Sequence, residues 1–533
     1  MAAESDRSPF VEPLPARPNL EMQQKRAKEL ARAVWRHDAD ALTRLQALHP
    51  RPPAPDALTL ADAQLVVARG YGFESWTAMK RKIESLTRTP VEQFVEALQQ
   101  QDVDRVRHLL DTSADVRASI NSPIWHFDAR PVIAAKRNLP LLDLLLQHGA
   151  DINLKSAWWA GPFGILEYDC TPEEAAPLIE RGAAVDVFAA SHLGMFDRLR
   201  ELIDRDPSLV HGRGGDGKTP LHLARTVDIA AYLVDRGADV DARCVDHESR
   251  PVQYLVREAP EAVRYLVERG AWFDIFVAIG LGDLPLVDRC RAADPDVLNH
   301  RIGEGLYQVA HDGRHPATAE QIGDRRGDIY RWVFGPLTAF EAATRLNQPA
   351  IVARLLEGAS LTQRLLAACG TGNRALALEV VAEHPRIVST LTRSQQRLLV
   401  ERVQTGDLPA VDLMLELGFD PHVTGQDTGD PLHWAAFLGD VALVKRLLSA
   451  NPAINAKDAT HGGTALGWAI FGSVHGWKCK SGQFVEVIEL LIDAGETFDA
   501  TALPTGREDV DTVLRRRLSN AERFLPHAER KDH

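Results

Sequence analysis

The sequence predicts an all-α fold: an elongated solenoid of helix–turn–helix repeats with short finger loops, preceded by a small helical module. Two observations support this prediction. Similar segments recur along the chain at a fixed spacing, and the second helix of each copy is amphipathic and ends at a glycine or an equivalent residue. The length of 533 residues fits such an array, because stacked repeats extend without enlarging one central core.

Three segments carry the repeat most clearly. They are RPVIAAKRNLPLLDLLLQHGADINLK at 130–155, GKTPLHLARTVDIAAYLVDRGADVDAR at 217–243 and GDPLHWAAFLGDVALVKRLLSANPAINAKD at 429–458. The residues that end the second helix recur 33 positions apart, from Gly149 to Gly182, from Gly237 to Gly270 and from Gly418 to Asn451. A fixed period of this length indicates stacked two-helix units.

One short motif points to the type of repeat. Residues 219–222 read Thr-Pro-Leu-His, and residues 430–433 read Asp-Pro-Leu-His. The motif and the period resemble the ankyrin repeat, whose signature is Thr-Pro-Leu-His-x-Ala every 33 residues. The resemblance implies that His222 and His433 hydrogen-bond the backbone of a neighbouring loop, and therefore that their role is structural.

The resemblance extends to a particular group of proteins. The segments LADAQLV…YGF…SW near the N-terminus and PLHWAA…GGTALGWAI…HGW near the C-terminus are similar to bacterial multi-repeat ankyrin proteins with a helical N-terminal module. The similarity covers most of the chain. It implies no assigned activity.

The residue types fit the positions that this repeat requires. Thr219 and Asp430 suit the N-cap of a first helix, and the proline after each suits the first helical turn, where its missing N–H is not needed. Ala435 and Ala436 allow neighbouring helices to approach closely. Glycines suited to a left-handed C-cap are Gly149, Gly182, Gly237, Gly270, Gly358 and Gly495.

The repeats predict a division of the chain into segments. Residues 20–49 predict two helices with a break near Asp38, and residues 57–86 predict a helix, a glycine turn and a second helix. The expected segments are a disordered N-terminal tail at 1–19, a helical module and cap at 20–88, ankyrin-like repeats at 89–300, an insertion at 301–334, further repeats at 335–502, and a C-terminal helical cap and tail at 503–533.

Aromatic residues recur in the last two repeats. Trp434 and Trp468 are 34 residues apart, as are Phe437 and Phe471. In the ankyrin pattern these variable positions of the first helix face the concave groove, where exposed aromatic side chains mark interfaces. The alternative is local packing, against an insertion at 472–483 that contributes Trp477. The two interpretations are compatible, since packed rings can form the wall of a groove.

The two insertions carry polar residues that could line a pocket. These candidates are His311, Asp312, His315, Arg331, His475 and Cys479. His311 and His315 have a spacing that would suit zinc on a helix, but Gly313 and Pro316 oppose a helix there. We therefore predict no metal site, no cofactor and no catalytic residue.

Composition and charge restrict the class of protein. The net charge of −13 opposes general nucleic-acid binding. Five cysteines without a Cys-x-x-Cys pair predict reduced thiols in a cytoplasmic protein. The N-terminus does not read as a signal peptide, and the absence of a run of 18 apolar residues predicts that the chain does not span a membrane.

These observations favour a non-catalytic scaffold that recognises a protein or peptide through the concave groove of the repeats. One alternative is an enzyme or small-molecule binder with a pocket formed by the insertions at 301–334 and 472–483. Another is a DNA-binding regulator that uses the helical pair at 57–86, where Lys80 and Arg81 lie near the second helix. The sequence does not decide whether the chain is an enzyme, although the balance is against it.

Overall fold

The computed structural model describes residues 10–15, 18–167, 169–425, 428–476, 482–498, 503 and 505–523. These residues form helices and no β-strand, apart from one isolated antiparallel bridge between Arg301 and Thr338. The chain divides into two compact units, of which one contains residues 1–88 and 368–533 and the other residues 89–367. The all-α prediction is therefore confirmed.

The N-terminal module consists of α1 Leu20–Trp35, α2 Ala39–Leu48, η1 Pro55–Ala57, α3 Leu60–Gly70 and α4 Trp76–Thr87. The predicted helix break is confirmed, because Asp38 is the N-cap of α2 and accepts a hydrogen bond from the backbone of Ala41. Thr59 and Asp62 form a capping box at the start of α3. Apolar side chains from the four α-helices, Val34 and Met79 among them, pack into a shared core.

The unit at 89–367 begins with α5 Pro90–Gln99, α6 Val103–Thr112, α7 Ala114–Ser119, η2 His126–Asp128, α8 Pro131–Ala134, α9 Leu139–Gln147, α10 Pro172–Glu180, α11 Val187–His192 and α12 Phe196–Arg205. It continues with η3 Pro207–His211, η4 Gly215–Gly217, η5 Pro220–Leu223, α13 Val227–Asp235, α14 Pro251–Leu255, α15 Pro260–Glu268, α16 Ile275–Leu281 and α17 Leu284–Ala293. It ends with η6 Val297–Asn299, η7 Gly305–Tyr307, α18 Ala319–Ile322, α19 Tyr330–Val333, α20 Ala339–Arg345 and α21 Pro349–Leu356.

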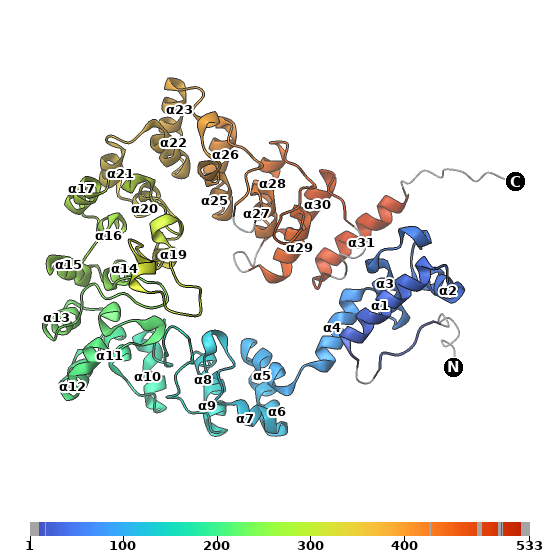
Figure 1. Ribbon diagram of the computed structural model, residues 1–533, viewed down its shortest axis with the longest axis horizontal. Coiled ribbons are helices and arrows are strands. Elements are labelled where there is room, and N and C mark those ends of the chain that lie inside the picture. Colours follow the sequence, from blue (N-terminus) through green and yellow to red (C-terminus); the bar gives the residue numbers. More distant parts are fainter. Residues whose placement is uncertain are drawn as a thin grey trace. The chain divides into compact units, whose positions relative to one another are not determined.

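Helices of this unit stack as repeats. The first helices α11, η5 and α14 follow one another in contact, and the second helices α12, α13 and α15 do the same (Figure 1). Their facing sides bury a continuous apolar core from Val187 to Ala367. A further core, from Phe94 to Leu193, lies under the earlier helices.

The remaining helices are α22 Leu361–Gly370, α23 Arg374–Glu383, η8 Val388–Thr390, α24 Arg393–Gln396, α25 Leu398–Gln404, α26 Leu408–Leu417, α27 Pro431–Leu438, α28 Val441–Leu448, α29 Ala465–His475, α30 Phe484–Asp493 and α31 Glu508–Arg523. The first helices α25, α27 and α29 pack side by side, as do the second helices α26, α28 and α30 (Figure 1). The last repeats therefore have the same two-layer arrangement.

The predicted caps are present. Gly149, Gly182, Gly237, Gly270, Gly358 and Gly495 all have positive φ, and so does Asn451. This backbone conformation favours glycine and, among other residues, asparagine. It turns the chain from the second helix into the next finger loop.

One first helix is very short. The first helix of the unit at 217–243 is the four-residue 3-10 helix η5. It stops because Ala224 is extended and Thr226 already caps α13, accepting a hydrogen bond from the backbone of Ile229. Few residues therefore remain for the first helix.

Two expectations from composition can be compared with the structure. The described cysteines, Cys170, Cys244, Cys290 and Cys369, are free and buried. Among the described residues, no helix is both long enough and apolar enough to cross a bilayer.

Candidate functional site

The motif histidines connect finger loops. His433 donates through its backbone N–H to Asp430 Oδ1 at 3.0 Å, its Nδ1 pairs with the same oxygen at 2.8 Å, and its Nε2 donates to the carbonyl of Gly463 at 3.1 Å. Burial opposes the charged imidazole, but the hydrogen bond and charge of Asp430 outweigh it, so the pKa of His433 lies above its ordinary value.

His222 has the same place with a different partner. Its Nε2 donates to the carbonyl of Ser249 at 3.1 Å, and its Nδ1 accepts from the backbone N–H of Thr219 at 3.1 Å. Burial lowers the pKa of His222 to about 3, and the charges of Arg213 and Lys218 act in the same direction. Both histidines therefore have the partners expected of a structural role.

The aromatic residues of the last repeats gather between α27 and α29. Trp434, Phe437 and Trp468 are buried, and their rings meet edge to face at centroid separations of 5.1 to 6.2 Å. Phe471 is 52% exposed and stacks on Phe437. The three buried rings therefore fit the interpretation of local packing. Phe471 fits the other interpretation, because it is an exposed apolar side chain.

These rings line a pocket of about 310 Å³. Its lining is almost entirely apolar and consists of Trp434, Phe437, His461, Gly463, Gly467, Trp468 and Phe471. We call it the aromatic pocket. Its size is at the lower end of the range for small-ligand pockets, and it fits one large side chain.

Hydrogen bonds and a glycine hold the pocket in shape. The indole Nε1 of Trp468 donates to Asp458 Oδ2 at 2.9 Å, which also accepts from the backbone N–H of Gly463 at 2.8 Å. Although burial opposes the charge, these hydrogen bonds lower the pKa of Asp458. A Cβ atom at Gly429 would lie 2.7 Å from Cη2 of Trp468, so only glycine fits there without movement.

Part of the second insertion borders this pocket. His475, at the end of α29, lies against the ring of Phe471 with a centroid separation of 4.8 Å. Two other candidates, Trp477 and Cys479, lie outside the residues that the structure describes. Their proposed roles stay predictions.

The insertion at 301–334 is folded against the repeats. The hydroxyls of Tyr307 and Tyr330 donate to the two oxygens of Asp274, at 3.1 and 2.8 Å, and all three side chains are buried. Arg326 donates to the Tyr307 hydroxyl at 2.9 Å and to Asp294 at 3.0 Å. The charge of Arg326 is therefore held inside the fold by a partly buried acidic partner.

The predicted candidates of this insertion have separate partners. His311 contacts the carbonyl of Asp246 through Nε2, and its Nδ1 accepts from the backbone N–H of Gly313 at 2.9 Å. His315 is largely exposed and pairs with Asp312 at 3.0 Å, which lowers the pKa of that carboxyl. Each imidazole thus has its own neighbours.

The fourth candidate, Arg331, packs its aliphatic stem beside Gly303 and lies over the ring of Trp332. Trp332 is 65% exposed. It lines a second pocket, of about 550 Å³, whose wall also includes Phe127, Leu223, Arg225, Asp216, Asp246 and His247. We call it the polar pocket.

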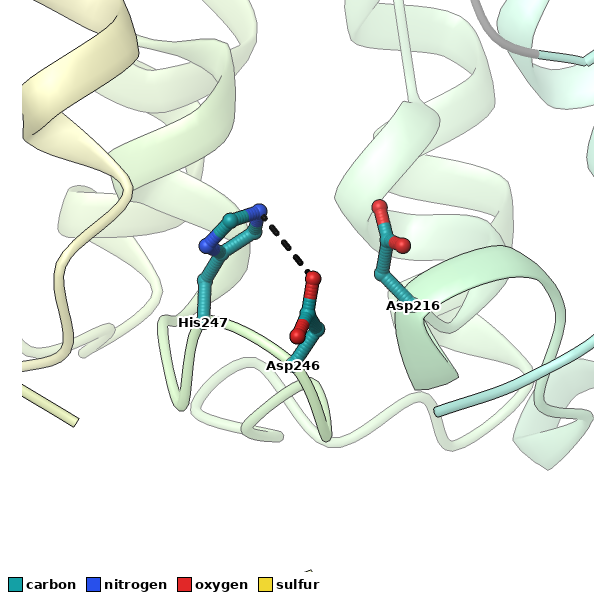
Figure 2. Close-up of side chains that lie close together, drawn as sticks. All are labelled: Asp216, Asp246 and His247. Atoms are coloured by element: carbon teal, nitrogen blue, oxygen red, sulfur yellow. Dashed lines mark ion pairs between the residues drawn. The ribbon is translucent and has the colours of Figure 1, made fainter. Parts of the chain in front are cut away.

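Sequence reasoning missed the polar residues at the base of this pocket. Asp216 and Asp246 are 30 positions apart, in consecutive finger loops, and His247 follows directly (Figure 2). Acidic residues in the same stretch of adjacent loops, three residues before the cap at Thr219 and four before the cap at Arg250, were an available signal. The contribution of the insertion, which includes Asp328, was not apparent without the fold.

The helical pair at 57–86 has its own contacts. On α4, Lys80 pairs with Glu84 at 3.8 Å, and Arg81 donates to the carbonyl of Thr505 at 3.2 Å. Phe73 and Trp76 pack against the core of the module. The DNA-binding alternative stays a prediction, with two of its basic residues already engaged in intramolecular contacts.

Comparison with known proteins identifies ankyrin repeats in two parts of the chain. A family model of three ankyrin-repeat copies matches residues 399–502, and a single ankyrin-repeat model matches residues 216–245. These ranges contain the helices on either side of the aromatic pocket and the finger loop of Asp216. The predicted repeat type is confirmed.

Curated relatives match limited parts of the chain. Ankyrin repeat and SAM domain-containing protein 6 is 27% identical in Rattus norvegicus and 34% identical in Mus musculus, over 165 residues that make up 28% of this chain and 19% of each relative. Alpha-latrocrustotoxin-Lt1a from Latrodectus tredecimguttatus is 24% identical over 172 residues, 31% of this chain and 10% of the toxin. The chain thus spans at most 19% of the length of these relatives. The expected bacterial source and cytoplasmic location stay predictions.

Proposed function

Because the chain contains ankyrin repeats, which generally mediate protein–protein interaction, we propose that it is a non-catalytic scaffold that recognises a peptide segment of a partner protein. The aromatic pocket would be the anchor point of the recognition surface. The observation that carries this proposal is Phe471, an exposed aromatic residue at a pocket lined by three buried rings.

The pocket chemistry indicates what a partner would insert. Its apolar lining favours a large apolar side chain, such as leucine, methionine or an aromatic residue. The residues that shape it are held before binding by the Asp458 hydrogen bonds, so a partner would lose little free energy in ordering them. Interfaces commonly concentrate their binding energy at such aromatic anchors.

A selection experiment tests this proposal. A library of random peptides displayed on phage is selected against the full chain, and the enriched peptides are synthesised and measured for affinity. We expect the enriched peptides to share one large apolar residue and to bind the Phe471→Asp variant at least about tenfold more weakly, since loss of an aromatic anchor typically removes more than about 1.4 kcal/mol.

A matched control separates the pocket from general surface change. Leu378, on α23, is 46% exposed, and Leu378→Asp makes the same kind of charge change away from the aromatic pocket. Peptides that bind wild type and Leu378→Asp equally, but not Phe471→Asp, support the proposal. Peptides that bind all three proteins equally contradict it.

The alternative of a small-molecule binder has one supporting observation. The insertion at 301–334 contributes Ile329, Trp332 and Val333 to the polar pocket. The proposed participation of the insertion at 472–483 is a separate prediction, because residues 477–481 lie outside the described part of the chain.

A further inference from the structure

Three side chains converge at the base of the polar pocket. Asp216 lies in η4, and Asp246 and His247 lie in the next finger loop (Figure 2). One donor atom of each residue lies within 4.8 Å of the donor atoms of the other two. The loops are joined because the backbone carbonyl of Asp216 accepts hydrogen bonds from the N–H groups of Val245 and Asp246. These hydrogen bonds hold the two loops that carry the cluster in a fixed position relative to each other.

The imidazole of His247 is held with one nitrogen toward this cluster. Its Nδ1 pairs with Asp328 Oδ1 at 2.9 Å, and its Nε2 lies 3.7 Å from Asp246 Oδ2. A carboxylate on one ring nitrogen favours the tautomer whose other nitrogen carries a lone pair. This arrangement of carboxylate, histidine and open nitrogen is how proteins commonly orient a metal-binding imidazole.

The insertion positions this histidine. The backbone N–H of Asp328 donates to the carbonyl of His247 at 3.1 Å, and the ring of Trp332 lies 4.6 Å from the imidazole. A Cβ at Gly327 would lie 2.2 Å from Oγ of Ser249, so the approach of the two segments is close. Residues from the insertion thus fix both the backbone and the ring of His247.

The carboxylates of the cluster outnumber the cations that pair with them, although Arg225 and Arg257 also line the pocket. Within the described residues, the ion pairs of Asp216, Asp246 and Asp328 are to Lys218, His247 and His311. Lys218 is the one permanent cation among these partners, against three carboxylates. The Asp216 side chain is only 4% exposed, so its charge is poorly screened by solvent.

We propose that Asp216, Asp246 and His247 form a binding site for a divalent first-row transition-metal ion. Two carboxylate oxygens and one imidazole nitrogen are donors that Zn²⁺, Co²⁺ and Mn²⁺ accept, whereas Mg²⁺ and Ca²⁺ prefer oxygen alone. Three protein donors leave coordination positions for water or a ligand in the polar pocket. This proposal is independent of the peptide recognition proposed above.

Lys218 gives the proposal a distinctive consequence. Its Nζ lies 3.2 Å from Asp216 Oδ2, so a bound cation would compete with this ammonium for the carboxylate. The Lys218→Met variant, which lacks this ammonium, should therefore bind the metal more tightly. A cluster that serves only as a salt bridge would bind no metal in either protein.

The test is a metal titration of the full chain, freed of metal by chelation and of any affinity tag. Zn²⁺ is titrated by calorimetry and Co²⁺ by visible absorption. We expect one equivalent to bind, with affinity reduced at least about tenfold in Asp246→Asn and in His247→Ala, reduced about 10–100-fold in Asp328→Asn, and increased in Lys218→Met. The control His315→Ala removes an exposed imidazole of the same insertion and should change nothing.

Circular dichroism shows whether His247→Ala folds. If it does not, the test uses Asp246→Asn, which keeps the shape of the side chain. The absence of binding to wild type and to Lys218→Met at about 1 mM metal, which would half fill a site with a Kd of about 1 mM, overturns the proposal. Equal binding by wild type and Asp246→Asn also overturns it, since the metal is then held elsewhere.

Discussion

The repeats at 217–243 and 429–458 share the Pro-Leu-His motif, yet they border pockets of opposite character. In the first, the histidine is followed by Leu223 and then Arg225, which line the polar pocket. In the second it is followed by Trp434 and then Phe437, which line the aromatic pocket. The shared motif holds the loops, whereas the variable positions after it line the two pockets and set their chemical character.

The comparison predicts very different costs for removing a tryptophan from each pocket. Trp434 is 2% exposed among packed rings, whereas Trp332 is 65% exposed. We expect Trp434→Ala to destabilise its repeats by about 3–5 kcal/mol through the cavity it leaves. Trp332→Ala should cost no more than about 0.5 kcal/mol.

Urea unfolding followed by circular dichroism measures both variants, with midpoints compared because a repeat array need not unfold in two states. Similar midpoints for the two variants would show that the side chain of Trp434 is not packed among the neighbouring rings.

Alanine substitutions at two glycines test how tightly the aromatic pocket is packed. Gly429→Ala places a Cβ 2.7 Å from Cη2 of Trp468, whereas Gly467→Ala meets only Thr464 Oγ1 at 3.8 Å. We expect Gly429→Ala to cost about 1–3 kcal/mol through overpacking. Gly467→Ala, within α29, should be neutral or stabilise by up to about 1 kcal/mol.

Thermal denaturation of the two variants checks this order. If Gly429→Ala melted with or above Gly467→Ala, the close contact between Gly429 and Trp468 would not exist in solution.

The smallest effect concerns the motif histidines. Asp430→Thr gives the second repeat the cap residue of the first. We expect the pKa of His433 to fall below its ordinary value, because burial is then opposed only by the weaker effects of the Gly463 carbonyl and the charge of Asp458. Proton NMR titration of the imidazoles measures this change. His222 serves as the internal control, because its environment is untouched.

The contribution of His433 to the free energy of unfolding depends on pH in opposite ways in wild type and in Asp430→Thr. In wild type the raised pKa of His433 adds stability below the unfolded-state pKa, and this contribution is lost as pH rises through the folded-state pKa. In Asp430→Thr, as at His222 with its pKa of about 3, stability is instead lost as pH falls below the unfolded value. An unchanged His433 titration in the variant would refute the role given to Asp430.

The sequence was sufficient for features that depend on local chemistry. The Asp430 cap and the left-handed position of Asn451 follow from residue types close to them in the chain, and the period follows from comparing the copies. The burial of Trp468 did not follow, because it depends on Asp458 and Gly429 in adjacent loops. The sequence also did not predict that α13 would begin so soon after the Pro-Leu-His motif.

The contact that the insertion adds to the polar cluster could not be predicted from the sequence, for a related reason. His247 and Asp328 are 81 positions apart and meet only because the insertion at 301–334 returns to an earlier finger loop. Sequence reasoning considered His311 and His315 as a pair because they are close along the chain. The fold instead gives His311 a partner in the finger loop, the backbone of Asp246.

The most direct test of the aromatic pocket is fluorine NMR of the chain labelled with 5-fluorotryptophan. The resonances of Trp434, Trp468 and Trp332 are assigned by single Trp→Phe variants, and a peptide from the phage selection is added. Our account predicts that the Trp434 and Trp468 resonances shift with saturation while that of Trp332, at the polar pocket, stays in place. Saturable binding that leaves Trp434 and Trp468 unmoved would contradict it.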